Sequence, residues 1–473
     1  MHTITPLGVA LTVFMGLLLL FLPRRYALLP VLSAMCYVPI GQAVMVSGVH
    51  LYFIRILIIL GWARMAVRGE LQWRGLTEID RAVFAWIASA LVLGTLLWMD
   101  QQALINRLGY AYDAIGSYLL FRAFLRDKED VFRVFKYLAL LAPLLAISMI
   151  VEKLTGRNSF SILGGVAEFD SVREGVIRSQ ATFGHSILAG LFGASVLPFF
   201  VALWHRGRGS RWLGLIGVVS AAIITGTAGS SGPLGAFAAA IVGLCMWRFR
   251  THMRTVRWSI VATLVGLQLV MKVPIWWAIS HISVFSGNTA WYRSNIIDKF
   301  IMNFGQWWLF GIRSTSSWGF LVGAGRFEGA DITNMYVRIG VDGGLLTLIL
   351  FIIVLVRCFR GVGVSLRRAC AAGESRRIQF GIWALGATLP AHAIGFFDVS
   401  YFDQSFGFLC LLFAMISCAT KLFRAVPQSA VVSDESSNTV GESQAALQGE
   451  PCMGKPEARW WAPQLDSPGS ESG

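Results

Sequence analysis

The sequence predicts an all-α fold, a bundle of about 12–13 transmembrane helices with two large loops on one side of the membrane. One observation is composition: 55% of the 473 residues are hydrophobic, 14% are charged, and the mean hydropathy is +0.63. Soluble domains carry about 25% charged residues. The other is pattern: apolar runs of about 17–22 residues follow one another, each long enough to cross roughly 30 Å of hydrocarbon.

The spans follow from these runs. We expect them at 4–22, 26–46, 49–67, 82–99, 104–121, 135–151, 186–204, 212–228, 233–247, 258–278, 339–356, 378–397 and 404–420. We take the first as a retained span and not a cleaved signal peptide. It is followed by Pro23-Arg24-Arg25, and no small-residue cleavage site is present. Prolines interrupt 26–46, and a tight turn at 229–233 joins two others. Either place would accommodate a re-entrant hairpin, which would leave twelve crossings and an inside N-terminus.

Lys and Arg account for the net charge of +14 and gather between alternate spans. This is the positive-inside pattern, and it places the N-terminus outside and the C-terminus inside for thirteen crossings. No soluble basic domain supports nucleic-acid binding. The clusters are 24–25, 64–81, 122–136, 206–211, 248–257, 357–377 and 421–424.

The seven cysteines lie in spans, a basic loop or the tail, so no disulfide framework is expected. No CxxC motif or His/Cys cluster indicates a metal site, and no cofactor is predicted.

Two ionisable residues fall inside predicted spans. Arg55 lies in the outer half of 49–67, where it either serves a function or extends its head group to the nearer interface. Asp113 lies in 104–121, and we expect a structural hydrogen bond within the bundle, with substrate lining as the alternative.

The two outer loops are 152–185 and 279–338. The first has mixed charge, typical of a solvated loop, and brings Arg178 and His185 to the membrane surface. In the second, Ile296, Phe300 and their neighbours repeat at helical spacing, which predicts an amphipathic helix on the outer leaflet. We expect Trp307 and Trp308 at headgroup depth, which places Arg293 beside lipid phosphates.

Arginines on one face suit an anionic lipid headgroup, because the planar guanidinium grips phosphate oxygens bidentately. A carboxylate or imidazole would take the proton from an attacking hydroxyl. No Asp-x-Asp pair in the outer loops calls for a divalent metal. The candidates for this acid–base role are Asp331, Asp298, Glu328 and His185.

Three segments resemble the bacterial O-antigen ligase and O-antigen polymerase superfamily. Thr333-Asn334-Met335-Tyr336, an acid at Asp342 and Gly343-Gly344 before a Leu-rich span resemble its loop-end motif. Arg178 before Thr182-Phe183-Gly184-His185, and Trp291-Tyr292-Arg293 with Gly311 downstream, are similar to its other two outer-loop motifs. The matches cover roughly 176–357.

The resemblance implies a metal-independent glycosyltransferase of GT-C type over residues 1–425, in the bacterial inner membrane with its active loops periplasmic. Such enzymes transfer oligosaccharides from undecaprenyl diphosphate to a glycan acceptor. Arg178 and Arg293 would then hold the donor diphosphate, and Asn334 would correspond to the catalytic Asn of the loop-end motif. Asp331, two residues before Thr333, is our own candidate for polarising the acceptor. Chain-length regulators or export proteins are the implied partners. Ligases have His where this chain has Thr333, so the resemblance favours a polymerase for O-antigen or exopolysaccharide.

Other interpretations stay open for these residues and for the chain. Asp331, Asn334 and His185 also suit helix N-caps. Asp398 and Asp403 either face the same cavity or, as we prefer, are solvated turn residues. The 229–233 turn lacks the Lys of a phosphate-binding loop. A lipid-linked sugar transporter or an inactive scaffold subunit are the rival functions. The segment 426–473, rich in Ser, Gln, Gly and Glu, is predicted to be a disordered cytoplasmic tail.

Overall fold

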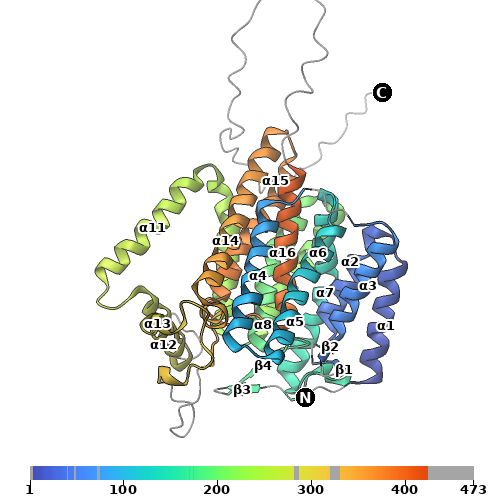
Figure 1. Cartoon of the computed structure of the whole chain (residues 1–473). Coiled ribbons are helices and arrows are strands. Elements are labelled where there is room, and N and C mark those ends of the chain that lie inside the picture. Colours follow the sequence, from blue (N-terminus) through green and yellow to red (C-terminus); the bar gives the residue numbers. More distant parts are fainter. Residues whose placement is uncertain are drawn as a thin grey trace, which may run out of the picture. The chain divides into compact units, whose positions relative to one another are not determined.

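A computed structural model describes residues 4–39, 41–46, 49–71, 75–169, 171–173, 175–281, 287–319 and 331–423. Helices dominate this part of the chain (Figure 1). The first half contains α1 (Pro6–Phe21), η1 (Arg24–Tyr26), α2 (Leu28–Tyr37), β1 (Ala43–Val46), β2 (Val49–Tyr52), α3 (Phe53–Val67), α4 (Glu78–Trp98), α5 (Gln101–Ala111), η2 (Tyr112–Gly116), α6 (Ser117–Phe124), α7 (Lys128–Thr155), η3 (Ser159–Leu163), β3 (Ser171–Arg173) and β4 (Val176–Arg178).

The second half continues the bundle and adds the elements of the second outer loop. It contains α8 (Ser186–Arg206), α9 (Arg208–Thr227), α10 (Ser231–Cys245), η4 (Met246–His252), α11 (Met253–Val270), η5 (Ile275–His281), α12 (Gly287–Met302), α13 (Phe304–Trp307), η6 (Ser316–Trp318), α14 (Met335–Ala371), α15 (Arg376–Gly395) and α16 (Asp403–Leu422). All thirteen predicted ranges coincide at least in part with helix.

Seven stretches in the described part of the chain are long and apolar enough to cross a membrane: α4, α7, α8, α9, Ser231–Val270, α14 and α16. The chain is therefore an all-α, polytopic helical protein. The count of thirteen crossings stays a prediction, because α1, α2, α3 and α10 have 16, 10, 15 and 15 residues. A span of roughly 30 Å needs about 17–25 helical residues.

Helix α8 forms the centre of the bundle and packs against α9, α10 and α15. It is buried over almost its whole surface, as its uniformly apolar sequence requires. Helix α11, by contrast, has no buried residue.

Four predicted spans have wrong boundaries. The spans 26–46 and 49–67 are too long, because Ala43–Val46 and Val49–Tyr52 pair as an antiparallel hairpin after α2 ends near Pro39. Its β-branched and aromatic residues suit a strand. The range 258–278 extends past the end of α11, since Pro274 separates that helix from η5. Helix α14 begins at Met335, four residues before the predicted 339.

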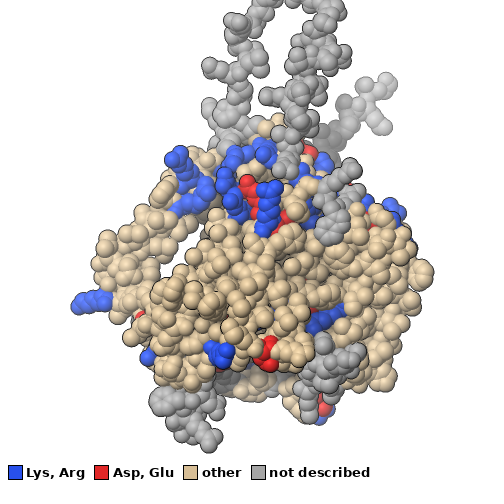
Figure 2. Space-filling model, viewed as in Figure 1, with Lys and Arg blue, Asp and Glu red and all other residues tan. Residues whose placement is uncertain are grey.

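The basic clusters gather at one end of the bundle, here called the basic end. Ion pairs join them across loops: Arg24 with Asp130, Lys128 with Glu374, Arg122 with Asp80, Arg206 with Glu129, and Arg357 with Glu78. Figure 2 shows Lys and Arg concentrated there, above a broad band of other residues. The opposite end, the outer end, carries both β-hairpins and α12 (Figure 1).

A break in α14 joins this helix to the second outer loop. Gly344 has φ +73°, and its turn leaves backbone groups without helical partners. Ile312 N donates to Val341 O at 2.8 Å, and Leu345 N donates to Trp308 O at 2.8 Å. The segment after α13 is thus clamped onto α14, which fixes the second outer loop against the helix that begins at Met335.

Candidate functional site

Arg178 ends β4 and is buried, with 8% of its surface exposed. The chain around it is held by the end of α7. Lys153 donates to the carbonyl of Ile177, and the Glu152 carboxylate accepts from Gln180 N at 2.7 Å and Ala181 N at 3.0 Å. Glu152 has no exposed surface. The prediction that this loop is solvated is therefore wrong for Glu152 and Arg178.

Arg293 lies on α12 and is also buried, with 7% exposed. Its guanidinium forms an ion pair with Asp398. The predicted helix is confirmed as α12. Trp307 is buried in the protein and not exposed as expected, and the position of Arg293 beside lipid phosphates stays a prediction. Trp307 stacks on Phe300 with ring centroids 3.8 Å apart, because this side of α12 and α13 packs against α14. Trp308 does remain exposed.

Asp398, in the turn after α15, links the two arginines. It is 3% exposed, so the interpretation as a solvated turn residue is wrong. Burial raises the pKa of the Asp398 carboxyl, and the charges of Arg293 and Arg178 oppose that rise. Arg293 thus contacts this carboxylate directly, and the charge of Arg178 reaches it from close by. Arg178 and Arg293, predicted from two separate loops, lie at one site.

The turn between α9 and α10 forms the floor of this site. A side chain at Gly232, in the first turn of α10, would overlap the Asp398 carboxylate, and one at Gly229 would contact Arg178. Gly229 also has φ +60°, which favours glycine. The carboxylate thus lies at the N-terminal end of α10, where the helix dipole favours negative charge.

Asn334 caps α14 and approaches the same turn. Its Oδ1 accepts from Tyr336 N at 2.9 Å and Val337 N at 3.2 Å, so the helix-cap interpretation is confirmed. Met335 N donates to Phe396 O at 2.8 Å, which ties this cap to the chain just before Asp398. Asn334 is 1% exposed, and its Nδ2 has no hydrogen-bond partner among the described residues.

Asp331 lies at the edge of this region and is exposed. Its carbonyl accepts from the Tyr292 hydroxyl at 3.1 Å. Burial, and secondly the Asp331 charge, raise the pKa of Tyr292. Asp331 is thus a neighbour of the arginine-bearing helix but does not cap α14.

The remaining acid–base candidates lie elsewhere. His185 caps α8, and its Nδ1 accepts from Ile187 N at 3.1 Å, as the cap interpretation expected. Asp298 accepts from Trp276 Nε1 at 3.3 Å. Glu328 lies outside the described residues.

The two ionisable residues inside predicted spans pair with each other. Arg55 donates from Nε and Nη2 to the two oxygens of Asp113, both at 2.7 Å. The bidentate pair supports the structural interpretation of Asp113, and it explains Arg55 without snorkelling. Asp113 also lines a cavity of about 570 Å³ inside the bundle, so its alternative role at a ligand stays open.

Sequence reasoning identified both arginines from their outer-loop positions and Asn334 from the family resemblance. It named Asp398 as a residue that could face the same site, but it preferred the solvated-turn interpretation. A lone Asp between two apolar spans gives no local sign of its partners. The chain matches no protein-family model, and no curated protein is significantly similar to it in sequence.

Proposed function

We propose that this protein is a membrane glycosyltransferase that extends a glycan from undecaprenyl-diphosphate-linked repeat units at the periplasmic face. One observation carries the proposal: Arg178 and Arg293 come from different outer loops and act on one buried carboxylate, Asp398. They do so at the end of the bundle opposite the basic clusters. By the positive-inside rule that end is exoplasmic.

The site suits a diphosphate for two physical reasons. Two guanidinium groups and the N-terminus of α10 surround a position already held by an anion, the Asp398 carboxylate. In addition, Arg293 Nε and Asn334 Nδ2 are buried donors with no hydrogen-bond partner among the described residues. Buried donors without acceptors are costly, and phosphate oxygens would satisfy them.

In the transfer step, the acceptor hydroxyl attacks the anomeric carbon of the donor sugar and loses its proton to a base. The bond between that carbon and the diphosphate oxygen breaks, and the diphosphate leaves with the electron pair. Negative charge grows on the leaving oxygen, so fixed arginines stabilise the transition state more than the ground state. Asp331, exposed beside α12, is the base that we propose.

Thr333 favours polymerisation over ligation to lipid A core. It occupies the position where ligases of the superfamily carry His, and its Oγ1 is buried without a partner among the described residues. A hydroxyl cannot replace imidazole as a base near neutral pH.

A lipid-linked sugar transporter is the second candidate, and the interior of the bundle favours it. The cavity of about 570 Å³ is lined by Arg107, Asp113 and Asp342, and α14 breaks beside it at Gly344. Buried ionisable residues and broken helices are typical of transporters.

Purified full-length protein with undecaprenyl-diphosphate-linked repeat units separates these functions. Longer glycan chains support a polymerase, and sugar on added lipid A core supports a ligase. If no product forms but the lipid moves between the leaflets of a liposome, the transporter is correct and the transferase proposal fails. If neither product nor lipid movement is seen, both proposals fail.

A further inference from the structure

The cavity inside the bundle is large enough for a ligand. Its volume of about 570 Å³ lies within the roughly 300–1,000 Å³ typical of small-molecule sites. It extends from the outer turn at Ser400 to Phe121 on α6, with walls from α3, α4, α5, α14 and α16. Ser400, where this wall begins, lies two residues after Asp398 in the chain.

The charges around the cavity balance. Of the three carboxylates that line it, Asp113 pairs with Arg55 at 2.7 Å. Asp342 lies 2.7 Å from Arg338 and 3.6 Å from Arg107. The third, Asp403, accepts from the backbone N–H of Gly184 at 2.6 Å. The wall thus carries three acids and two arginines, and Arg55 pairs with Asp113 from outside the lining, so the wall has no excess positive charge to hold a phosphate.

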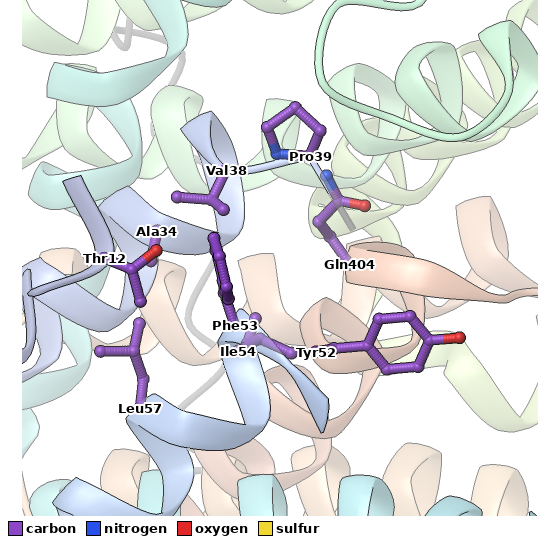
Figure 3. A pocket seen from close by; sticks show the side chains of 9 residues that line it. All are labelled: Thr12, Ala34, Val38, Pro39, Tyr52, Phe53, Ile54, Leu57 and Gln404. Carbon is purple, nitrogen blue, oxygen red and sulfur yellow. The ribbon is translucent and has the colours of Figure 1, made fainter. Parts of the chain in front are cut away.

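The outer wall carries acceptors in need of donors. Asp403 Oδ1 has no well-aligned hydrogen-bond donor among the described residues, and Gln404 Oε1 has none either. Gln404 is 2% exposed, and its amide nitrogen donates to Thr182 O at 2.9 Å, which fixes the side chain. Gln404 also borders a pocket of about 10 Å³, room for one water at most (Figure 3). An O–H group in the large cavity would satisfy the Asp403 oxygen.

The backbone holds Asp403 in place at a cost. Its φ of +49° lies in the left-handed region, which a non-glycine residue rarely adopts. A side chain at Gly184 would collide with the Asp403 carboxylate. Strained positions of this kind persist where the surrounding structure requires them, and they cluster at functional sites.

Aromatic rings complete the wall. Tyr110 and Phe406 lie 5.0 Å apart between ring centroids, and Trp86 lies 6.2 Å from Phe406. Sugars present apolar C–H faces to such rings and hydroxyls to carboxylate and amide oxygens. A hydrocarbon chain would leave the Gln404 and Asp403 oxygens unsatisfied, and a phosphate would find no excess positive charge in this wall.

We infer that this cavity binds a neutral oligosaccharide, with a sugar hydroxyl donating to Asp403. That the oligosaccharide is the acceptor glycan rests on the proposed function, whereas the binding itself does not. The position of the cavity behind Asp398 would bring the end of an acceptor toward the donor diphosphate.

Isothermal titration of purified full-length protein tests this inference. The probe is the neutral oligosaccharide repeat released by mild acid from the lipid-linked pool of the producing cells. We expect saturable binding, weakened about tenfold or more by Asp403→Asn. Asn tolerates a positive φ and can still accept from Gly184, but it can present an N–H₂ donor where the carboxylate offers an acceptor.

Two further variants control the experiment. Ala90→Phe should abolish binding, because Ala90 lines the cavity from α4 and a phenyl ring there takes up its space. Asp100→Asn, at an exposed aspartate outside the cavity, should bind like the native protein. The inference is overturned if the native protein binds no saccharide, or if Asp403→Asn and Ala90→Phe both bind it as tightly as the native protein does. Binding without any glycan transfer would instead refute the proposed transferase and leave this inference standing.

Discussion

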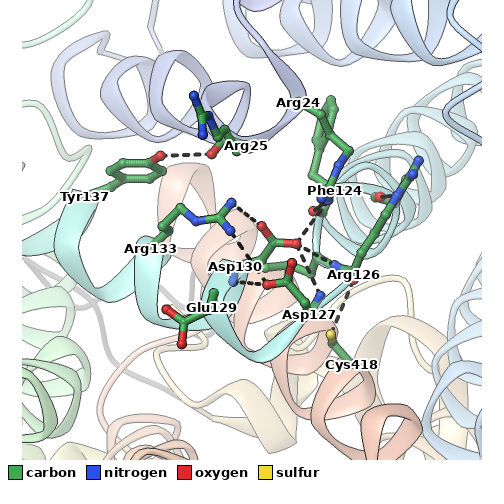
Figure 4. A network of polar contacts seen from close by, with 12 residues as sticks. Arg24, Arg25, Phe124, Arg126, Asp127, Glu129, Asp130, Arg133, Tyr137 and Cys418 are labelled. Atoms are coloured by element: carbon green, nitrogen blue, oxygen red, sulfur yellow. Dashed lines mark hydrogen bonds and ion pairs between the residues drawn. The ribbon is translucent and has the colours of Figure 1, made fainter. Parts of the chain in front are cut away.

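The two ends of the bundle treat buried charge differently. At the basic end, Asp130 accepts from Arg24, Arg133 and the backbone N–H groups of residues 126 and 127 (Figure 4). Asp80 is similarly surrounded by Arg122, Tyr118 and Ser417. At the outer end, Arg293 and Asn334 keep buried donors without partners among the described residues.

This difference separates structural from ligand-binding charge. A saturated network has no capacity left for a ligand, and its role is to hold helices together. Unsatisfied buried groups cost free energy, and their persistence is explained if a ligand completes them. Arg206 Nη1 at the basic end also lacks a partner among the described residues, but the Arg206 side chain is 21% exposed and that of Arg293 only 8%.

The largest effect is expected at the basic end and on stability alone. Asp130→Ala leaves two arginines without their buried partner and should cost about 3–5 kcal/mol. Thermal unfolding in detergent would measure this loss, and activity per folded molecule should be unchanged. Glu78→Gln is the matched control, because its exposed pair with Arg357 is worth less than about 1 kcal/mol. A variant that stays stable but loses activity would break the comparison.

At the outer end, the guanidinium fork should matter more than the charge. We expect Arg178→Lys and Arg293→Lys to reduce glycan transfer about 100-fold, because an ammonium cannot grip phosphate bidentately. Arg178→Ala should abolish transfer while the protein remains inserted and abundant. Arg293→Ala alone would leave Asp398 as a buried carboxylate without its partner, so this change is made together with Asp398→Asn. Full activity in both Lys variants would refute the phosphate-binding role.

Asp398 should compete with the anionic ligand. Asp398→Asn should bind inorganic diphosphate about tenfold more tightly than the native protein near neutral pH, since Arg293 no longer has a charged partner. Titration calorimetry of both proteins at several pH values cancels the ionisation of the ligand itself. The advantage of the variant should shrink as the pH falls and native Asp398 takes up its proton.

The same group gives a signed effect on stability. Because the pKa of Asp398 is raised on folding, the folded protein binds this proton more tightly than the unfolded chain. Its contribution to stability therefore falls as the pH rises from its ordinary value of 3.8 through the raised value. If Asp398→Asn binds diphosphate more tightly by the same factor at every pH, the raised pKa does not belong to Asp398.

The smallest effect tests the Asn334 amide. Ser is as good an N-cap as Asn but has no Nδ2, so Asn334→Ser should change stability by less than about 0.5 kcal/mol. Transfer should fall about tenfold if the amide donates to the ligand. Thermal unfolding and glycan transfer, measured on the same preparation, check both expectations. Unchanged transfer would leave Asn334 as a helix cap only.

Hydropathy alone was enough to predict the fold class and most helices, because span length and helical period are properties of short segments. The same holds for the basic end, whose clusters alternate with the spans, and for the Asn334 cap. Arg178 and Arg293 were identified from their places near the membrane surface in two outer loops, together with the family resemblance. The strand pairing of Ala43–Val46 with Val49–Tyr52 was missed, because short apolar runs suit either helix or strand.

Only the tertiary structure decided which charges meet. Arg293 and Asp398 are separated by more than a hundred residues, as are the members of the Arg107–Asp342 pair, and nothing local to either residue specifies its partner. The burial of Trp307 and the cavity behind Asp403 likewise depend on how whole helices pack. The sequence determined which segments are helical and which end is basic; the packing of those helices determined where a buried group was left in need of a ligand.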